Sequence, residues 1–363
     1  MDQTIRGKAS HVFSIGRFPG VILAVWLFGC LALLVSGVLA QPESGSLISQ
    51  AQQALDRGQF EEAIPLLEQL RDQDEQNLPV RQALVDALMR LRRWDEAAAE
   101  MDSLRQDFPD QPRVAFLAAA VAFRMGQFEA AAARASEAIA LDDSSPEIFR
   151  VRALSRFMSQ DYEGYKADLY AILERDPNNA EAYYHLGRYH YEKQTFAESQ
   201  EAFRKATELD PQFFKAHYFL GWCLQAAGDL EGAKGSYLEA IQIVQKAGIN
   251  YGWPFTDLGD VLILQGQYDE GLVWLKRAIE NDPKLPFSHF RYAGALLKKE
   301  ATPEVESELR TAIQLDPGYP EAYYLLGTYY KRVGDREKAR EALEKFQELR
   351  KNPTPSPFGV RRK

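Results

Sequence analysis

Small side chains recur along the chain with a period of 34 residues. Units of this length begin near residues 44, 78, 112, 146, 180, 214, 252, 286 and 320, with four additional residues before the unit at 252. The eighth residue is Gly or Ala in eight of these nine units, and the twentieth residue is mostly small as well. Because two small residues twelve positions apart allow two helices to touch closely, the pattern predicts one helical hairpin in each unit.

Turn and stop signals separate the predicted helices at repeating positions. Glycine followed by Asp or Gln lies in four of the turns, at Met125–Phe128, Ala227–Leu230, Gln265–Tyr268 and Val333–Arg336. Glycine supplies the left-handed end of a first helix, and Asp or Gln opens the second helix. Asp-Pro pairs then end the second helices at Pro177, Pro211, Pro283 and Pro317, because proline lacks a backbone N–H and restrains the residue before it. The sequence therefore predicts an all-α chain.

The unit from Ala180 to Pro211 resembles the tetratricopeptide repeat, whose signature includes an aromatic, Leu-Gly and later Ala, Phe and Pro. The matching residues are Tyr183, Leu186, Gly187, Phe196, Phe203, Ala206 and Pro211. The unit from Pro320 to Phe346 matches nearly as well, and the resemblance covers residues 44–350. It implies an α-solenoid of stacked hairpins that forms a right-handed superhelix. In this family a concave groove, lined by the first helices, holds a peptide or a helix of a partner protein.

The units before residue 180 depart from the signature because they lack Leu-Gly. Tyr165 also occupies a place that favours Ala, so the fourth hairpin is either splayed or closed by Gly164 after a slip of one residue. The four inserted residues fall within Val244–Gly252. A longer second helix or a wider loop would accommodate them equally well.

Aromatic residues occupy a helix face that is expected to be polar. Places 2, 5 and 9 of a first helix point away from the face that packs the hairpin, because successive residues are about 100° apart. The candidate groove residues at or near these places are Tyr184, Arg188, Tyr218, Trp222, Trp253, Phe287, Phe290, Arg291 and Tyr324, with Lys215 and Phe219 beside them. Large exposed apolar patches mark interaction sites. An alternative is that Tyr184, Tyr218 and Tyr324 pack against the neighbouring unit.

Residues 1–40 have the pattern of a targeting segment. A basic stretch precedes Val21–Ala40, which carries no charge, and Val38 and Ala40 are suitable residues before a signal-peptidase cut at Gln41. A cut after Ala40 predicts a periplasmic or secreted body. An uncut segment predicts a helix of about 30 Å that anchors the body in the membrane. Both alternatives place the body outside the cytoplasm.

Charge is unevenly distributed and argues against a nucleic-acid partner. The chain has a net charge of −9, with +2 in residues 1–40 and +4 in residues 351–363, which leaves −15 on the body. An acidic body repels a phosphate backbone. The segment 351–363 is too short and too rich in proline to fold, and we expect a disordered basic tail.

Candidate catalytic and metal-binding residues are few. His185 and His190 lie five residues apart, about 140° around a helix, and the other histidines are His11, His217 and His289. The sequence contains no Gly-rich phosphate loop, no Gly-x-Ser-x-Gly and no Cys-x-x-Cys. Cleavage after Ala40 would leave Cys223 as the single cysteine, which excludes an intramolecular disulfide. We therefore expect no enzyme, no metal and no cofactor.

These observations favour an exported scaffold that binds a partner protein or peptide in a concave groove. One alternative is a structural subunit of the cell envelope that associates with itself. Another is an accessory protein that binds a glycan or another ligand, since rows of Trp and Tyr also stack on sugar rings. We expect the protein to contact the membrane only through the segment before residue 41, and only if that segment is retained.

Overall fold

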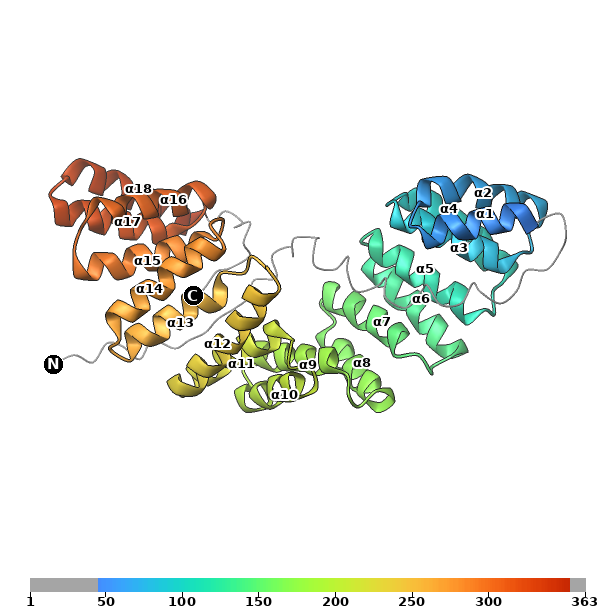
Figure 1. Ribbon diagram of the computed structural model, residues 1–363, viewed down its shortest axis with the longest axis horizontal. Helices are drawn as coiled ribbons and strands as arrows, with labels where there is room; N and C mark the ends of the chain where they lie inside the picture. The colour runs from blue at the N-terminus through green and yellow to red at the C-terminus, as the bar shows by residue number, and fades with distance from the viewer. Residues whose placement is uncertain (1–44, 353–363) are drawn as a thin grey trace. The chain divides into compact units, whose positions relative to one another are not determined.

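The computed structural model describes residues 45–352, and every regular element in that range is a helix (Figure 1). The first nine helices are α1 (Gly45–Asp56), α2 (Phe60–Gln73), α3 (Leu78–Arg90), α4 (Trp94–Asp107), α5 (Pro112–Arg124), α6 (Phe128–Leu141), α7 (Pro146–Met158), α8 (Tyr162–Arg175) and α9 (Ala180–Glu192). The next nine are α10 (Phe196–Leu209), α11 (Phe214–Ala226), α12 (Leu230–Lys246), α13 (Trp253–Leu264), α14 (Tyr268–Asn281), α15 (Pro286–Lys299), α16 (Pro303–Leu315), α17 (Pro320–Val333) and α18 (Arg336–Lys351). The predicted all-α class is confirmed.

The described chain divides into two compact units, residues 45–182 and residues 183–352. Within each unit, helices pack mainly against their neighbours in the sequence. The first helices of consecutive hairpins also touch, as α3, α5 and α7 do in one unit and α13, α15 and α17 do in the other. This pattern of near-neighbour contacts is that of an α-solenoid, in which each hairpin buries its apolar face against the next.

The predicted targeting segment 1–40 and the segment 353–363 lie outside the described residues. None of the helices between residues 45 and 352 combines the length and the apolar composition that crossing a bilayer requires.

Glycine at the eighth place allows an aromatic ring to lie against the backbone of the first helix. A β-carbon on Gly221 would lie 2.5 Å from the Tyr237 ring, and one on Gly187 would lie 2.8 Å from the Phe203 ring. Both rings are completely buried. A larger residue at either glycine would therefore force the second helix away from the first.

The turn between the two helices of a hairpin requires a left-handed residue even where glycine is missing. Gly126, Gly228 and Gly266 have φ between 77° and 84°, whereas Arg92 and Gln160 take the same role with φ of 59° and 66°. This backbone conformation costs a non-glycine residue about 1–2 kcal/mol, so the packing of the hairpin outweighs it.

The aspartate of each Asp-Pro pair orders the loop that leads to the next hairpin. The side chain of Asp210 accepts a hydrogen bond from the backbone N–H of Gln212 at 2.9 Å, and Asp316 accepts one from Gly318 at 3.0 Å. Asp176 and Asp282 likewise accept a hydrogen bond from the backbone N–H of the residue two positions later. Proline therefore stops the helix, and aspartate fixes the turn that follows.

The 34-residue pattern is irregular at two places, namely at Tyr165 and at the insertion before the unit at 252, and the local structure accommodates both. Tyr165 is buried, and its ring lies 5.2 Å from that of Phe157 in α7. Gly164 lies against Arg156, whose Nη1 donates to the Gly164 carbonyl at 3.2 Å. The insertion before the unit at 252 is shared between the second helix and the loop that follows it. Helix α12 has 17 residues where α10 and α14 have 14, and six residues separate α12 from α13 where four separate α10 from α11.

Buried His289 makes the stability of the second unit dependent on pH. Its Nδ1 lies 2.5 Å from Glu308 Oε2 of α16, and its Nε2 lies 3.0 Å from the Pro283 carbonyl. Burial lowers the pKa of His289, but the contacts with Glu308 and Pro283 outweigh it, and the pKa is raised above its ordinary value of 6.5. The folded state therefore holds this proton more tightly than the unfolded state does.

We expect the stabilisation from protonated His289 to be complete below about pH 6.5 and to disappear as the pH rises through the raised pKa. The measurement is the free energy of unfolding of wild type and His289→Gln across this range. Their difference should shrink as the pH rises, and Glu308→Gln should weaken the pH dependence of wild type in the same way. A difference that stays constant with pH would contradict the assignment.

Candidate functional site

A cavity of about 820 Å³ opens between the first helices of the last hairpins in the unit 183–352. Residues of α13, α15 and α17 line it, and Gln225 of α11 lies at one edge. We call this cavity the first-helix groove. Its volume falls within the range of about 300–1,000 Å³ that is typical of ligand pockets.

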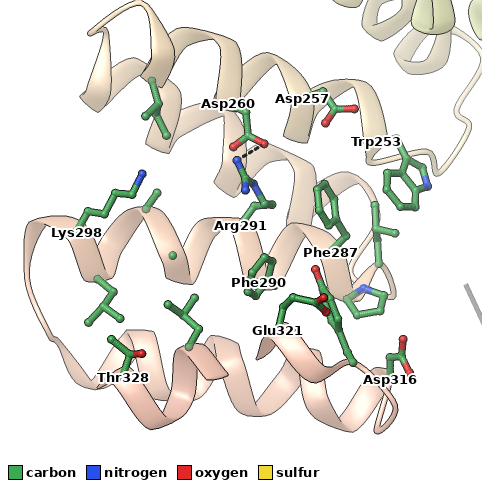
Figure 2. Close-up of a pocket in the computed structure, with 18 of the residues that line it drawn as sticks. Trp253, Asp257, Asp260, Phe287, Phe290, Arg291, Lys298, Asp316, Glu321 and Thr328 are labelled. Atoms are coloured by element: carbon green, nitrogen blue, oxygen red, sulfur yellow. Dashed lines mark ion pairs between the residues drawn. The ribbon is translucent and has the colours of Figure 1, made fainter. Parts of the chain in front are cut away.

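Two aromatic pairs form the apolar part of the first-helix groove. Trp253 and Phe287 are stacked, with ring centroids 5.2 Å apart and an angle of 22° between the planes. Phe290 and Tyr319 lie 5.0 Å apart at 56°. Trp253 and Phe290 are each partly exposed and line the cavity. Phe290 lies between α15 and α17, and Trp253 lies at the start of α13 beside Phe287 (Figure 2). The groove therefore offers aromatic faces on which an apolar or planar group can stack.

Prolines fix where the three lining helices begin. Pro254, Pro286 and Pro320 each lie in the first turn, where the missing N–H costs no intrahelical hydrogen bond and the fixed φ suits a helix. Trp253, Phe287 and Glu321 are therefore held in the first turns of α13, α15 and α17.

Carboxylates lie beside the aromatic pairs. Asp257 is buried and accepts hydrogen bonds from Tyr218 Oη at 2.8 Å and from Trp222 Nε1 at 2.6 Å, both on α11. Asp260 pairs with Arg291 Nη2 at 2.6 Å, as Figure 2 shows. Asp316 precedes α17, and Glu321 lies in its first turn. The aromatic part of the groove is therefore also its acidic part.

The remaining cations lie toward the opposite end of the lining helices. Lys298 belongs to the last turn of α15, and Arg332 belongs to the last turn of α17. Figure 2 shows Lys298 far along α15 from Phe287. Arg332 Nη1 donates a hydrogen bond to the Leu297 carbonyl. Counting all lining residues, four carboxylates face three cations. Three of the carboxylates lie at or near the start of a lining helix, whereas Asp260 lies in the second half of α13.

Four of the nine residues proposed from the sequence line the first-helix groove, namely Trp253, Phe287, Phe290 and Arg291. Arg291 lies between two lining partners, because its guanidinium pairs with Asp260 and lies 5.8 Å from the Phe287 ring.

The other five residues lie outside this cavity, and packing between hairpins explains most of them. Tyr184 and Tyr218 are only 6% and 2% exposed. The Tyr184 ring contacts those of Phe213 and Phe219, and Tyr218 contacts Tyr251, so both tyrosines belong to the core between neighbouring hairpins. We therefore omit them from the candidate binding surface.

Trp222, Arg188 and Tyr324 also have structural neighbours. Trp222 is partly buried and donates to Asp257. Arg188 lies 5.7 Å from the Phe219 ring, and Tyr324 is 51% exposed with its ring 5.2 Å from Phe346. None of the three lines the first-helix groove.

Sequence reasoning missed the carboxylates of the first-helix groove. Asp257 and Asp260 are buried polar residues in α13, a helix whose other residues from Pro254 to Leu262 are mostly apolar and buried. Two aspartates three residues apart in such a helix were the available signal, because buried carboxylates persist only where partners satisfy them.

The described residues include neither a cluster that could hold a metal ion nor an exposed cysteine. Between residues 45 and 352, no group of three or more His, Cys, Asp or Glu side chains is arranged to hold a metal ion. Cys223 is buried, and burial raises its pKa to about 11. Its thiol is therefore protonated at neutral pH and poorly suited to act as a nucleophile.

Comparisons with known proteins agree with this architecture. The chain is 27% identical over 207 residues to "Tetratricopeptide repeat protein 37" of Xenopus laevis, which covers 55% of this chain and 13% of that protein. It is 34% identical over 85 residues to "TPR repeat-containing thioredoxin TTL4" of Arabidopsis thaliana, which covers 23% and 12%. The matched region thus spans only about an eighth of either relative.

A solved structure shows the same fold over a longer stretch. The crystal structure of the APC/C hetero-tetramer Cut9–Hcn1 matches 79% of this chain and 56% of that chain, with a TM-score of 0.53 and 15% identity.

Family profiles identify the repeats themselves. Profiles described as "Tetratricopeptide repeat" match residues 54–121, 180–213, 215–234, 255–285 and 320–353, together just over half of the sequence. The chain belongs to the tetratricopeptide repeat family.

Proposed function

We propose that this chain is an exported scaffold that binds a segment of a partner protein in the first-helix groove. The observation that carries the proposal is the pair of partly exposed rings, Trp253 and Phe290, inside a cavity of about 820 Å³. Aromatic residues that are held in a pocket and bordered by polar groups are typical anchors of protein interfaces. The partner would contribute apolar or planar side chains to these rings.

The chemistry of the groove suits binding better than catalysis. None of the residues that line it in the described part of the chain is Ser, Cys or His, so it lacks the nucleophile–histidine pair of the common hydrolases. Asp257 accepts two hydrogen bonds and Asp260 forms an ion pair, which orients both carboxylates. Aromatic faces and fixed carboxylates together favour a ligand that carries both apolar and basic groups.

Affinity capture with matched variants tests this proposal. Wild-type protein, Trp253→Ala and Tyr170→Ala would each be used to capture proteins from the exported fraction of the source cell, with quantification by mass spectrometry. Tyr170 is a suitable control because its ring is 48% exposed on α8, in the other compact unit. A ligand of the groove should be lost with Trp253→Ala and retained with Tyr170→Ala. Identical captured sets for all three proteins would contradict the proposal.

Export is supported by the charge and apolarity of residues 1–40, and it makes a separate prediction. We expect the exported protein to begin at Gln41, because Val38 and Ala40 are acceptable to signal peptidase. N-terminal peptide mass spectrometry of cell fractions would detect this end. A chain that starts at Met1 in the membrane fraction would instead show a retained anchor, and accumulation in the cytoplasm would contradict export.

A further inference from the structure

The first-helix groove and the segment 353–363 have complementary chemistry. The groove combines two aromatic pairs with carboxylates at Asp257, Asp316 and Glu321 and with the Asp260–Arg291 ion pair. The segment contains prolines at 353, 355 and 357, an aromatic residue at Phe358 and three consecutive cations from Arg361 to Lys363. We infer that the segment 353–363 of the same chain is an occupant of the first-helix groove, an inference that rests on the binding function proposed above.

The place where the described chain ends brings this segment close to the groove. Helices α17 and α18 form a hairpin, and the ring of Tyr324 near the start of α17 lies 5.2 Å from that of Phe346 near the end of α18. The end of α18 therefore lies beside the start of α17. Tyr319 and Glu321, which line the groove, lie at that same start.

The segment is long enough to cross the groove. A proline-rich chain in the polyproline II conformation advances about 3.1 Å per residue, so eleven residues span roughly 34 Å. Packed helices lie about 8–10 Å apart, which places α13 roughly 20 Å from α17 across α15. A path from α17 to α13 would bring the prolines over Tyr319 and Phe290. It would bring Arg361 to Lys363 near Asp257 and Asp260.

Known modes of recognition suit each part of this path. Proline-rich segments in the polyproline II conformation dock on aromatic grooves, because little conformational freedom is lost on binding. Arginine both stacks on aromatic rings and pairs with carboxylates, which are adjacent at Trp253 and Asp257. The groove therefore selects a proline-rich segment followed by basic residues.

An occupant on the same chain changes how a foreign ligand binds. Attachment to the same chain gives the segment an effective concentration on the order of millimolar, so even a weak contact would keep the groove filled. A partner protein must then displace the segment, and a partner with the same proline-rich and basic character would compete most directly.

The test is the binding of a fluorescent synthetic peptide with the sequence of residues 353–363 to two forms of the full chain. One is wild type, and the other carries Arg361→Glu, Arg362→Glu and Lys363→Glu, so that its own segment no longer suits the groove. We expect the peptide to bind the charge-reversed form at least tenfold more tightly than wild type. Binding should weaken when the salt concentration is raised, because salt screens the attraction between the basic residues of the peptide and the carboxylates of the groove.

Variants of the groove in the charge-reversed background show where the peptide binds. Trp253→Ala and Glu321→Gln should each weaken peptide binding several-fold. Glu280→Gln on the exposed side of α14 should leave it unchanged. A peptide of the same composition in scrambled order should bind at least fivefold more weakly. Equal binding of both peptides, or equal binding to wild type and the charge-reversed form, would overturn the inference.

Two further measurements distinguish this inference from a contact between two copies of the chain and from the proposed function. A dimer of wild type that the charge reversal dissolves, measured as mass in solution, would place the segment on a second copy and overturn the intramolecular contact. A captured partner that requires Trp253 while the peptide fails to bind would retain the proposed function and reject the segment as occupant. Peptide binding that requires Trp253, with no captured partner that requires it, would retain the segment as occupant and reject the proposed function.

Discussion

Replacing Phe203 with alanine is expected to lower the free energy of unfolding of the second unit by about 3–5 kcal/mol, the range for removing a buried aromatic ring from a core. Phe203 is fully buried in α10, and its ring is stacked at 5.6 Å on that of Phe219. The ring also fills the space against Gly187, where a β-carbon would come within 2.8 Å of it. Its loss would leave a cavity shared by two hairpins.

Urea unfolding followed by circular dichroism and tryptophan fluorescence would measure this effect. Trp222 lies close to the cavity, with its ring 5.7 Å from Phe219, and would report local opening. Phe196→Ala is the matched control on the same helix, because that ring is 39% exposed and its removal should cost less than half as much. Equal losses for the two variants would show that the Phe203 ring does not hold the hairpins together.

Replacing Trp253 or Phe290 with alanine is expected to weaken the binding of a groove ligand by about 1–3 kcal/mol, the usual range for an aromatic anchor. This corresponds to a loss of roughly 5- to 150-fold in affinity. Both rings line the first-helix groove and are partly exposed, so a bound segment would cover them. Calorimetric titration of the captured partner against each variant would measure the loss.

The same variants must be compared for stability, because Phe290 also contacts Tyr319. Tyr170→Ala serves as the control for binding, since its ring lies on α8 and outside the groove. Variants that unfold at lower urea concentration yet bind the partner like wild type would assign both rings to the packing of the hairpins. The binding surface would then lie elsewhere.

The arrangement of helices could be predicted from the sequence because every hairpin repeats the same local signals. The predicted units near 78, 112 and 286 begin where α3, α5 and α15 begin, and the unit at 252 precedes the first residue of α13. Small residues at the eighth place, glycine in the turn and Asp-Pro at the end each act within a few residues. Such signals do not depend on how distant parts of the chain are placed.

Fewer residues of the candidate groove could be predicted, because the spacing of side chains describes each first helix as a separate cylinder. In a solenoid, a first helix contacts both its own partner and the first helix of the next hairpin, as α13 and α15 do. The fifth-place tyrosines Tyr184 and Tyr218 are therefore buried between hairpins rather than exposed.

The carboxylates of the groove were missed for a related reason. A pattern of aromatic and basic residues does not include carboxylates, and the hydrogen-bond partners of Asp257, Tyr218 and Trp222, are 39 and 35 residues away in the sequence. No local pattern indicates a contact of that range. Buried aspartates in an apolar helix predict that partners exist without identifying them.

The central claim is that a protein segment binds in the first-helix groove, and site-specific photo-crosslinking tests it most directly. A photoreactive p-benzoylphenylalanine would replace Thr328, which lines the groove on α17 (Figure 2). In a control protein it would replace Lys276, which is exposed on α14. Irradiation in the presence of the captured partner should link that partner at position 328 and leave position 276 unlinked. Mass spectrometry should place the link in a proline-rich or basic stretch of the partner. A link at position 276 with none at position 328 would contradict the account.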